Sequence, residues 1–170
     1  VLVTQATDIA KELYLSVLLR AELPIEHMHR HVFAAAVAVA ECVREALPSS
    51  CRVEVKWPND VLIDGRKTSG INCPVQIEAG RVYFGVLGVG VNVNLEAGEL
   101  PEELREIATS LRIAGGKSVD RVAFGEELLA RLEREIDAVR ADLPSDLQRF
   151  FVQKFSTADQ PILAVRLASE

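Results

Sequence analysis

The sequence predicts an α+β domain, in which a β-sheet packs against helices. Three observations lead to this fold class. A two-residue turn signal at Asp64-Gly65 joins two short β-type runs, a long β-forming run covers residues 81–94, and helical patterns cover residues 25–47 and 119–141. The 170 residues suit one domain with a sizeable core, and 49% hydrophobic with 26% charged residues is a globular composition.

Bulk charge and cysteine usage limit the class of function. The net charge of −6 argues against a nucleic-acid-binding surface across the whole domain, although a local basic site is compatible with it. The three cysteines lack the CxxC spacing, so we expect reduced, buried or half-buried thiols in a cytosolic protein. No signal-peptide pattern is present, and the most apolar helical stretch, residues 32–40, is too short to span a bilayer. We therefore expect a cytoplasmic protein without membrane contact.

The first elements are a helix start, a strand and a long helix. Residues 4–12 carry a cap pattern that predicts the start of a helix, and Leu13 to Leu19 is an apolar run that predicts a buried strand. Residues 25–47 are apolar on most faces and predict a largely buried helix. His27 and His31 have the spacing of a helical metal-ligand pair, but no third ligand is evident, so a solvated helix start is the preferred interpretation.

The most informative stretch is the hairpin that ends at Ile71. Residues 51–56 alternate between polar and apolar and predict the strand that leads into it. Its turn brings Asn59, Asp60 and Lys67 to one small region. Acidic and amide oxygens beside an ammonium suit Mg²⁺, phosphate and carboxylate ligands. A surface hairpin with ordinary charges is the alternative interpretation.

A second informative stretch is the β-forming run at 81–94. Gly88 and Gly90 alternate and therefore lie on one face of the strand. That face lacks side chains, so a flat ligand or another backbone can lie directly on it. Asn92 and Asn94 offer amides at its end. The alternative is tight packing of the sheet on a helix.

The remaining segments predict helices and one last strand. Pro74 interrupts its strand and predicts a bulge or a sheet edge. We expect a short acidic helix near 101–111, a stop at Gly115-Gly116, a helix at 146–155 and a strand at 160–167. Residues 119–141 predict an amphipathic helix with a solvated charged face. Its predicted apolar stripe is Val122, Leu128, Leu129, Leu132, Ile136 and Val139.

Two motifs together resemble the signature of the biotin–protein ligases, also called biotin–[acetyl-CoA-carboxylase] ligases. The first is Lys56-Trp57-Pro58-Asn59-Asp60, followed by Gly65-Arg66-Lys67 and Ser69-Gly70-Ile71. The second is Gly88-Val89-Gly90-Val91-Asn92-Val93-Asn94, which resembles that family's glycine strand, while Leu13-Tyr14-Leu15-Ser16-Val17 resembles its strand before the long helix. The motifs follow the family's order and spacing over roughly residues 4 to 155. The lipoate ligases share the fold but lack the Lys-Trp-Pro-Asn-Asp string.

The resemblance implies a fold and a reaction. The fold is a mixed β-sheet packed against helices, of the class II aminoacyl-tRNA-synthetase-like or biotin–lipoyl ligase type. The catalytic domain would span residues 1–157, and residues 158–170 would start a C-terminal β segment. In the reaction, biotin and ATP form biotinyl-5′-adenylate and pyrophosphate, and a lysine of a biotin carboxyl carrier protein then attacks the mixed anhydride. A DNA-binding repressor role is not expected, and an exposed sheet edge suggests a homodimer.

The resemblance also implies roles for individual residues. Lys67 matches the family's essential lysine beside the biotin carboxylate and the α-phosphate, where a cation between two anions stabilises the transition state. Asn59 and Asp60 match residues that hold the adenylate, the phosphates or Mg²⁺. The other matches are Gly70, Gly88 and Gly90 close to biotin, Asn92 near the nucleotide, and Trp57 on the adenine side, for which a core role is an equal alternative.

The sequence departs from the family pattern in its basic loop. The family's Gly-Arg-Gly-Arg-x-Gly-Arg loop folds over biotin and the adenylate, whereas here Leu13 follows directly on residues 7–12, and the family's Ser-Thr pair falls at Gln5-Ala6. Each lost charge-assisted hydrogen bond would remove on the order of 1.5–3 kcal/mol, which weakens adenylate binding. Residues 72–76 also differ from the short apolar strand that the family usually has there. Two interpretations stay open: an incomplete sequence of a normal ligase, and a shortened paralogue that binds biotin or adenine nucleotide, or dimerises, without ligation.

Overall fold

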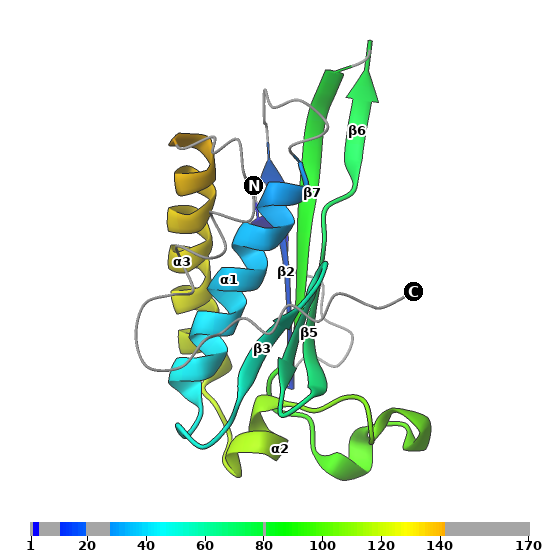
Figure 1. Ribbon diagram of the computed structural model, residues 1–170, viewed down its shortest axis with the longest axis vertical. Coiled ribbons are helices and arrows are strands. Elements are labelled where there is room, and N and C mark those ends of the chain that lie inside the picture. Colours follow the sequence, from blue (N-terminus) through cyan, green and yellow to red (C-terminus); the bar gives the residue numbers. More distant parts are fainter. Residues whose placement is uncertain (1, 4–10, 20–27, 80, 142–170) are drawn as a thin grey trace.

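The computed structural model describes residues 2–3, 11–19, 28–79 and 81–141 (Figure 1). The predicted helix at 146–155, the strand at 160–167, the C-terminal β segment at 158–170 and His27 lie outside the described residues. Of the predicted helix start at residues 4–12, Lys11 forms a turn and Glu12 already begins a strand.

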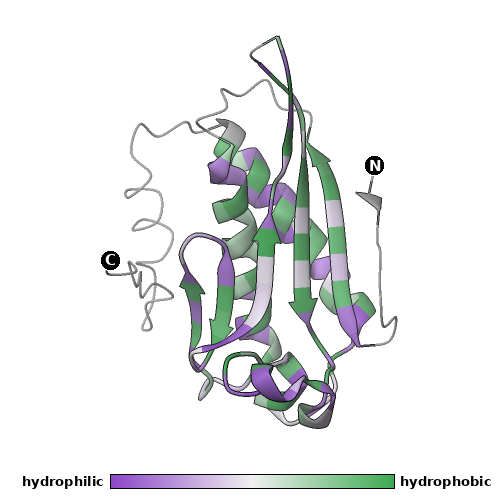
Figure 2. Ribbon diagram, turned by 90° about the vertical axis from the view of Figure 1, so that its right-hand side faces the viewer, coloured by the Kyte–Doolittle hydropathy of each residue, from purple (hydrophilic) through white to green (hydrophobic). Residues whose placement is uncertain are grey.

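Two long helices cover one face of an antiparallel sheet. The strands are β1 Leu2–Val3, β2 Glu12–Leu19, β3 Val53–Lys56, β4 Asp60–Ile63, β5 Arg66–Asn72, β6 Val75–Glu78 and β7 Arg81–Asn92. Their order in the sheet is β1-β2-β7-β5-β4-β3. β6 also pairs with β7, and Cys73-Pro74 interrupts the strand between β5 and β6. The helices α1 His29–Ala46 and α3 Arg121–Ala141 lie together behind the sheet as it faces the viewer in Figure 2.

The predicted α+β fold, with a sheet packed against helices, is confirmed. Every strand pair in the described ranges is antiparallel, and parallel pairing there is limited to one bridge between Lys67 and Ala108. The predicted long strand at 81–94 corresponds to β7, and the predicted strand at 13–19 corresponds to β2.

The core lies between the sheet and the helices because alternate strand residues point toward the helices. Leu87, Val89 and Val91 of β7 are at most 2% exposed, whereas the residues between them are half-buried. In α1, residues 34–40 are at most 1% exposed, which confirms a buried helix. Glu54 of β3 was predicted on the polar side of its strand but is buried, with 9% of its surface exposed. Its carboxylate lies 3.1 Å from the guanidinium of Arg52.

The first turn of α1 is buried, so the prediction of a solvated helix start is wrong there. Arg30 is 8% exposed and His31 is fully buried. The reason is that the helix begins against the sheet, where Met28 packs on Val82 of β7. In the ranges that the structure describes, His, Cys, Asp and Glu side chains form no group of three or more that could hold a metal ion.

The predicted acidic helix over 101–111 is wrong. The chain forms two short 3-10 helices, η2 Ala97–Glu99 and η3 Glu102–Leu104, and then α2 Leu111–Gly115. Between η3 and α2 the backbone leaves the helical path to pair with Lys67 of β5. This long-range pairing overrides the local helical preference. Gly116, with φ +70°, ends α2 as expected for a glycine stop.

The helix α3 agrees with its prediction apart from its first turn. Leu128, Leu132, Ile136 and Val139 are buried and Leu129 is half-buried, but Val122 is 66% exposed and Phe124 is buried instead. The carboxylate of Asp120 accepts hydrogen bonds from the backbone N–H groups of Val122 and Ala123 (2.9 and 3.1 Å), which starts the helix with Val122 on its outer side. No helix in the described part of the chain is long and apolar enough to cross a membrane.

The charged face of α3 is only partly solvated. Arg131 is half-buried and bridges to Glu41 and Glu45 of α1 at 3.2 and 2.6 Å, as well as to Glu127 of its own helix at 2.6 Å. The ion pairs therefore join the two helices instead of only lining their surface.

Nearby Cys42 is buried, and this burial raises the pKa of its thiol to about 12. Cys51 and Cys73 are half-buried free thiols, in agreement with the prediction of reduced cysteines.

Candidate functional site

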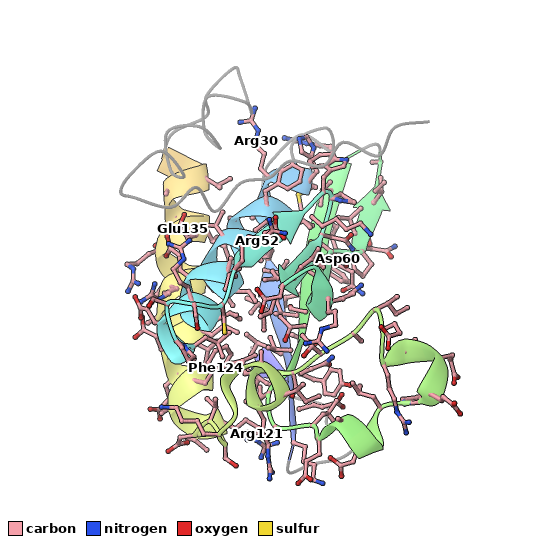
Figure 3. All side chains as sticks on the ribbon, turned by 60° about the horizontal axis from the view of Figure 1, so that its bottom comes forward. Arg30, Arg52, Asp60, Arg121, Phe124 and Glu135 are labelled. Carbon is pink, nitrogen blue, oxygen red and sulfur yellow. The ribbon has the colours of Figure 1, made fainter. Side chains whose placement is uncertain are left out.

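The predicted hairpin brings Lys67 and Asp60 into contact. Asp64 and Gly65 have φ angles of 49° and 80°, which make the two-residue turn whose twist matches that of the flanking strands. The Nζ atom of Lys67 lies 2.5 Å from Oδ1 of Asp60, and the lysine side chain stays 48% exposed. In Figure 3, Asp60 lies among the strands, away from Glu135 on α3. The site is thus an ion pair with its cation open to solvent.

A bulge in β5 decides on which face Lys67 lies. The register between β4 and β5 shifts at this point, so Thr68 has no partner residue in β4. Strict alternation would place Lys67 on the buried side with Ser69 and Ile71, which are 3% and 2% exposed. The extra residue reverses the alternation, and a Cβ built on Gly70 would lie 3.3 Å from Nζ of Lys67. The ammonium therefore lies beside the glycine on the open face.

Residues 107–109, here called the strap, hold this bulge from outside the hairpin. The backbone N–H of Lys67 donates to the carbonyl of Ile107, and the N–H of Thr109 donates to the carbonyl of Lys67, both at 2.8 Å. Nδ2 of Asn92, at the end of β7, donates to the carbonyl of Thr109 at 3.0 Å. Sequence reasoning missed the strap. Its single local signal is the N-cap that follows it, where Ser110 Oγ accepts from the N–H of Ile113 at 3.0 Å.

The glycines share the open face as predicted, but two side chains border them. Gly70 is the partner of Gly90, and Gly88 is the partner of Asn72. A Cβ on Gly90 would lie 3.4 Å from the ring of Tyr14 in β2, and a Cβ on Gly88 would overlap Oδ1 of Asn72. The expectation of a bare strand face is therefore corrected, because Tyr14 and Asn72 take part of the space that the glycines leave.

The amides at the end of β7 are engaged with the protein's own backbone. Nδ2 of Asn94 donates to the carbonyl of Val119 at 2.8 Å, and its Oδ1 accepts from the N–H of Val119 at 2.9 Å. Asn92 donates one hydrogen bond to the strap, at the carbonyl of Thr109. Both residues hold the segments that follow β7, a function that the sequence pattern did not indicate.

Trp57 and Asn59 precede β4 on either side of Pro58. The Trp57 ring stacks on Phe33 of α1, with centroids 4.4 Å apart and an interplanar angle of 29°. Trp57 is nevertheless 48% exposed, so the alternative of a core role is wrong. Nδ2 of Asn59 donates to the carbonyl of Ile71 at 2.8 Å, which fixes this segment to β5. The site thus has an exposed aromatic face near the start of its hairpin.

The donor set suits an anionic ligand accompanied by Mg²⁺. Lys67 supplies an exposed ammonium, and Asp60 supplies a carboxylate that is 18% exposed. Magnesium prefers oxygen ligands and usually keeps several waters, binding through one or two carboxylates plus substrate phosphates. The single Asp60 carboxylate and the side-chain Oδ1 of Asn59 are oxygen ligands of that kind, although Oδ1 of Asp60 already contacts Lys67.

Replacing Asn92 with alanine is expected to loosen the strap. The lost hydrogen bond to Thr109 is worth about 0.5–1.5 kcal/mol, so amide exchange at Lys67 and Thr109 should accelerate by roughly 2- to 10-fold. Hydrogen exchange of these two amides measures the effect. Asn94→Ala is the matched control, because Asn94 anchors Val119 and not the strap. Equal exchange at Lys67 in wild type and Asn92→Ala would contradict the strap function.

A family model and several curated relatives match this chain. The model of the biotin/lipoate A/B protein ligase family matches residues 7–92, which include the hairpin and the glycines. The bifunctional ligase/repressor BirA of Bacillus subtilis (strain 168) is 38% identical over 121 residues, which are 71% of this chain and 37% of the relative. The biotin–[acetyl-CoA-carboxylase] ligase of Mycobacterium tuberculosis is 37% identical over 117 residues, 68% of this chain and 40% of the relative.

A solved structure shares the architecture. The biotin protein ligase from Aquifex aeolicus, in complex with biotin and ATP, superposes with a TM-score of 0.67 at 26% sequence identity. The match covers 86% of this chain and 57% of that chain. This chain therefore spans well under half of the two curated relatives' length and little more than half of the Aquifex protein.

Proposed function

The chain belongs to the biotin/lipoate A/B protein ligase family, and from that premise we propose that it activates biotin with ATP and transfers it to a carrier protein. The products of the first step would be biotinyl-5′-AMP and pyrophosphate. The acceptor in the second step would be a lysine of a biotin carboxyl carrier protein. The observation that carries the proposal is the ammonium of Lys67, which lies on the open face beside Gly70 and pairs with Asp60.

In the first step, Lys67 would act on two anions. The biotin carboxylate has to approach the α-phosphate of ATP, and both are negatively charged. An ammonium between them reduces their repulsion and stabilises the charge that develops as the carboxylate oxygen bonds to phosphorus and pyrophosphate leaves. Asp60, 2.5 Å from Nζ of Lys67, would orient the ammonium, and the strap would hold its backbone.

Other residues would position the two substrates. Gly70, Gly88 and Gly90 would leave room for biotin on the sheet, and Trp57 would offer its exposed ring to the adenine. Asn59 and Asp60 would bind Mg²⁺ together with the phosphates, where the ion neutralises negative charge. Asn92 would act near the nucleotide through the strap that it anchors.

A binding protein without transferase activity is the second candidate. The observation that favours it is the missing basic loop, together with Gln5-Ala6 at the family's Ser-Thr pair. Without the loop, fewer donors would face the carboxylate and the phosphates, and water would reach the reactive adenylate. Biotin or adenine nucleotide would then bind without productive ligation.

One assay separates the two candidates. The protein is incubated with biotin, MgATP and a biotin carrier domain, and the carrier is probed with streptavidin. Labelling of the carrier supports the ligase. Absence of labelling with biotin binding intact by calorimetry supports the binding protein, and absence of both contradicts the proposal.

The prediction that this chain does not bind DNA stays a prediction. The Bacillus subtilis relative is named a repressor as well as a ligase, but that name describes a chain of which only 37% is matched here. Homodimerisation through a sheet edge and cytoplasmic localisation are likewise predictions.

A further inference from the structure

Asn72 lies on the same open face of the sheet as Gly70, although the proposed reaction assigns it no part. It is the last residue of β5, two positions after Gly70, so both residues face the same side. It is also the cross-strand partner of Gly88, and its Oδ1 occupies the space where a Cβ of Gly88 would lie. Asn72 is exposed. Its polar atoms are therefore available beside the glycines.

The open face thus has a charged end and a neutral polar end. The ammonium of Lys67 lies near Gly70, and the carboxamide of Asn72 lies one strand repeat further on, roughly 7 Å along β5. Gly88 and Gly90 lie beside this stretch in the neighbouring strand. A ligand whose carboxylate contacts Lys67 and whose body rests on the glycines would present its opposite end to Asn72.

We propose that Asn72 is a specificity-determining residue, which selects acids whose far end is a cyclic urea over acids whose far end is apolar. The inference rests on the proposed function, because it assumes that the carboxylate end contacts Lys67. A carboxamide offers two donors and an acceptor, which complement the carbonyl and N–H groups of a urea ring, as in biotin. A dithiolane ring, as in lipoate, would leave the carboxamide without a partner.

The test compares biotin and lipoate binding to the wild type, Asn72→Leu and Gln76→Leu. Leucine has a similar size and lacks hydrogen-bonding groups. Gln76 is a matched control because it is an exposed amide in β6, the next strand along the chain, which also pairs with β7. Calorimetry gives the Kd of each acid, pyrophosphate exchange gives the KM for biotin and for ATP, and thermal unfolding verifies the fold.

The expected result is about a tenfold weaker Kd for biotin in Asn72→Leu, with the Kd for lipoate unchanged or tighter. The KM for ATP and the Tm should stay at the wild-type values, and Gln76→Leu should bind like the wild type. Unchanged biotin affinity in Asn72→Leu, or an equal loss for both acids, would overturn the specificity function while leaving the proposed reaction intact. If the wild type binds neither acid, the proposed function fails and this inference fails with it.

Discussion

Replacing Lys67 with alanine is expected to lower biotin-dependent pyrophosphate exchange by about 10²- to 10³-fold without unfolding the protein. The magnitude is that of losing one preorganised group that stabilises transition-state charge. The fold should persist because the lysine side chain is 48% exposed and packs in no core. The measurement is the exchange rate at saturating biotin and MgATP, together with thermal unfolding of the same samples.

Two further variants make this result specific to Lys67. Lys117→Ala removes an exposed lysine from the loop between α2 and α3 and should leave exchange unchanged. The double variant Lys67→Ala with Asp60→Asn removes the carboxylate that the first substitution leaves unpaired. If exchange recovered in the double variant, the loss would come from repulsion by Asp60 and not from the missing cation. Persistent exchange in Lys67→Ala would show that the assignment is wrong.

Replacing Gly70 with valine is expected to slow biotin-dependent pyrophosphate exchange by about 100-fold and to weaken biotin binding. A Cβ at this position would lie 3.3 Å from both Cε and Nζ of Lys67 and 3.8 Å from Oδ1 of Asp60, so the side chain would displace the ammonium. A shift of about 1 Å in such a group can cost 10²-fold in rate. Valine is favoured in strands, so the sheet should form normally. Calorimetry with biotin and the exchange assay measure the two effects.

The control for Gly70→Val is Gly98→Val. Gly98 lies in η2, where an added Cβ would meet no atom within 4 Å. The control should bind biotin like the wild type and confirm that added bulk alone is harmless. Wild-type biotin affinity in Gly70→Val would mean that the ligand does not rest on this glycine. A large loss of Tm in Gly70→Val alone would instead identify Gly70 as a structural residue.

Local patterns in the sequence determined most of the elements. The Asp64-Gly65 turn predicted the hairpin because both residues tolerate positive φ, and this turn alone brings the two strands together. A β-forming run predicted β7, a stretch that is apolar on most faces predicted α1 as a buried helix, and helical periodicity predicted α3. The proximity of Asp60 and Lys67 could therefore be predicted from the sequence.

Only the tertiary structure decided how that neighbourhood is arranged. The face on which Lys67 lies depends on a bulge that the strap stabilises from residues 107–109, whose local composition predicted a helix. The glycines of β7 are bordered by Tyr14 and Asn72, which come from two other strands. These features arise from backbone pairing and contacts between residues far apart in the sequence, and no local propensity encodes them. The sequence by itself indicated which groups would carry the proposed chemistry, and long-range pairing determined where those groups lie.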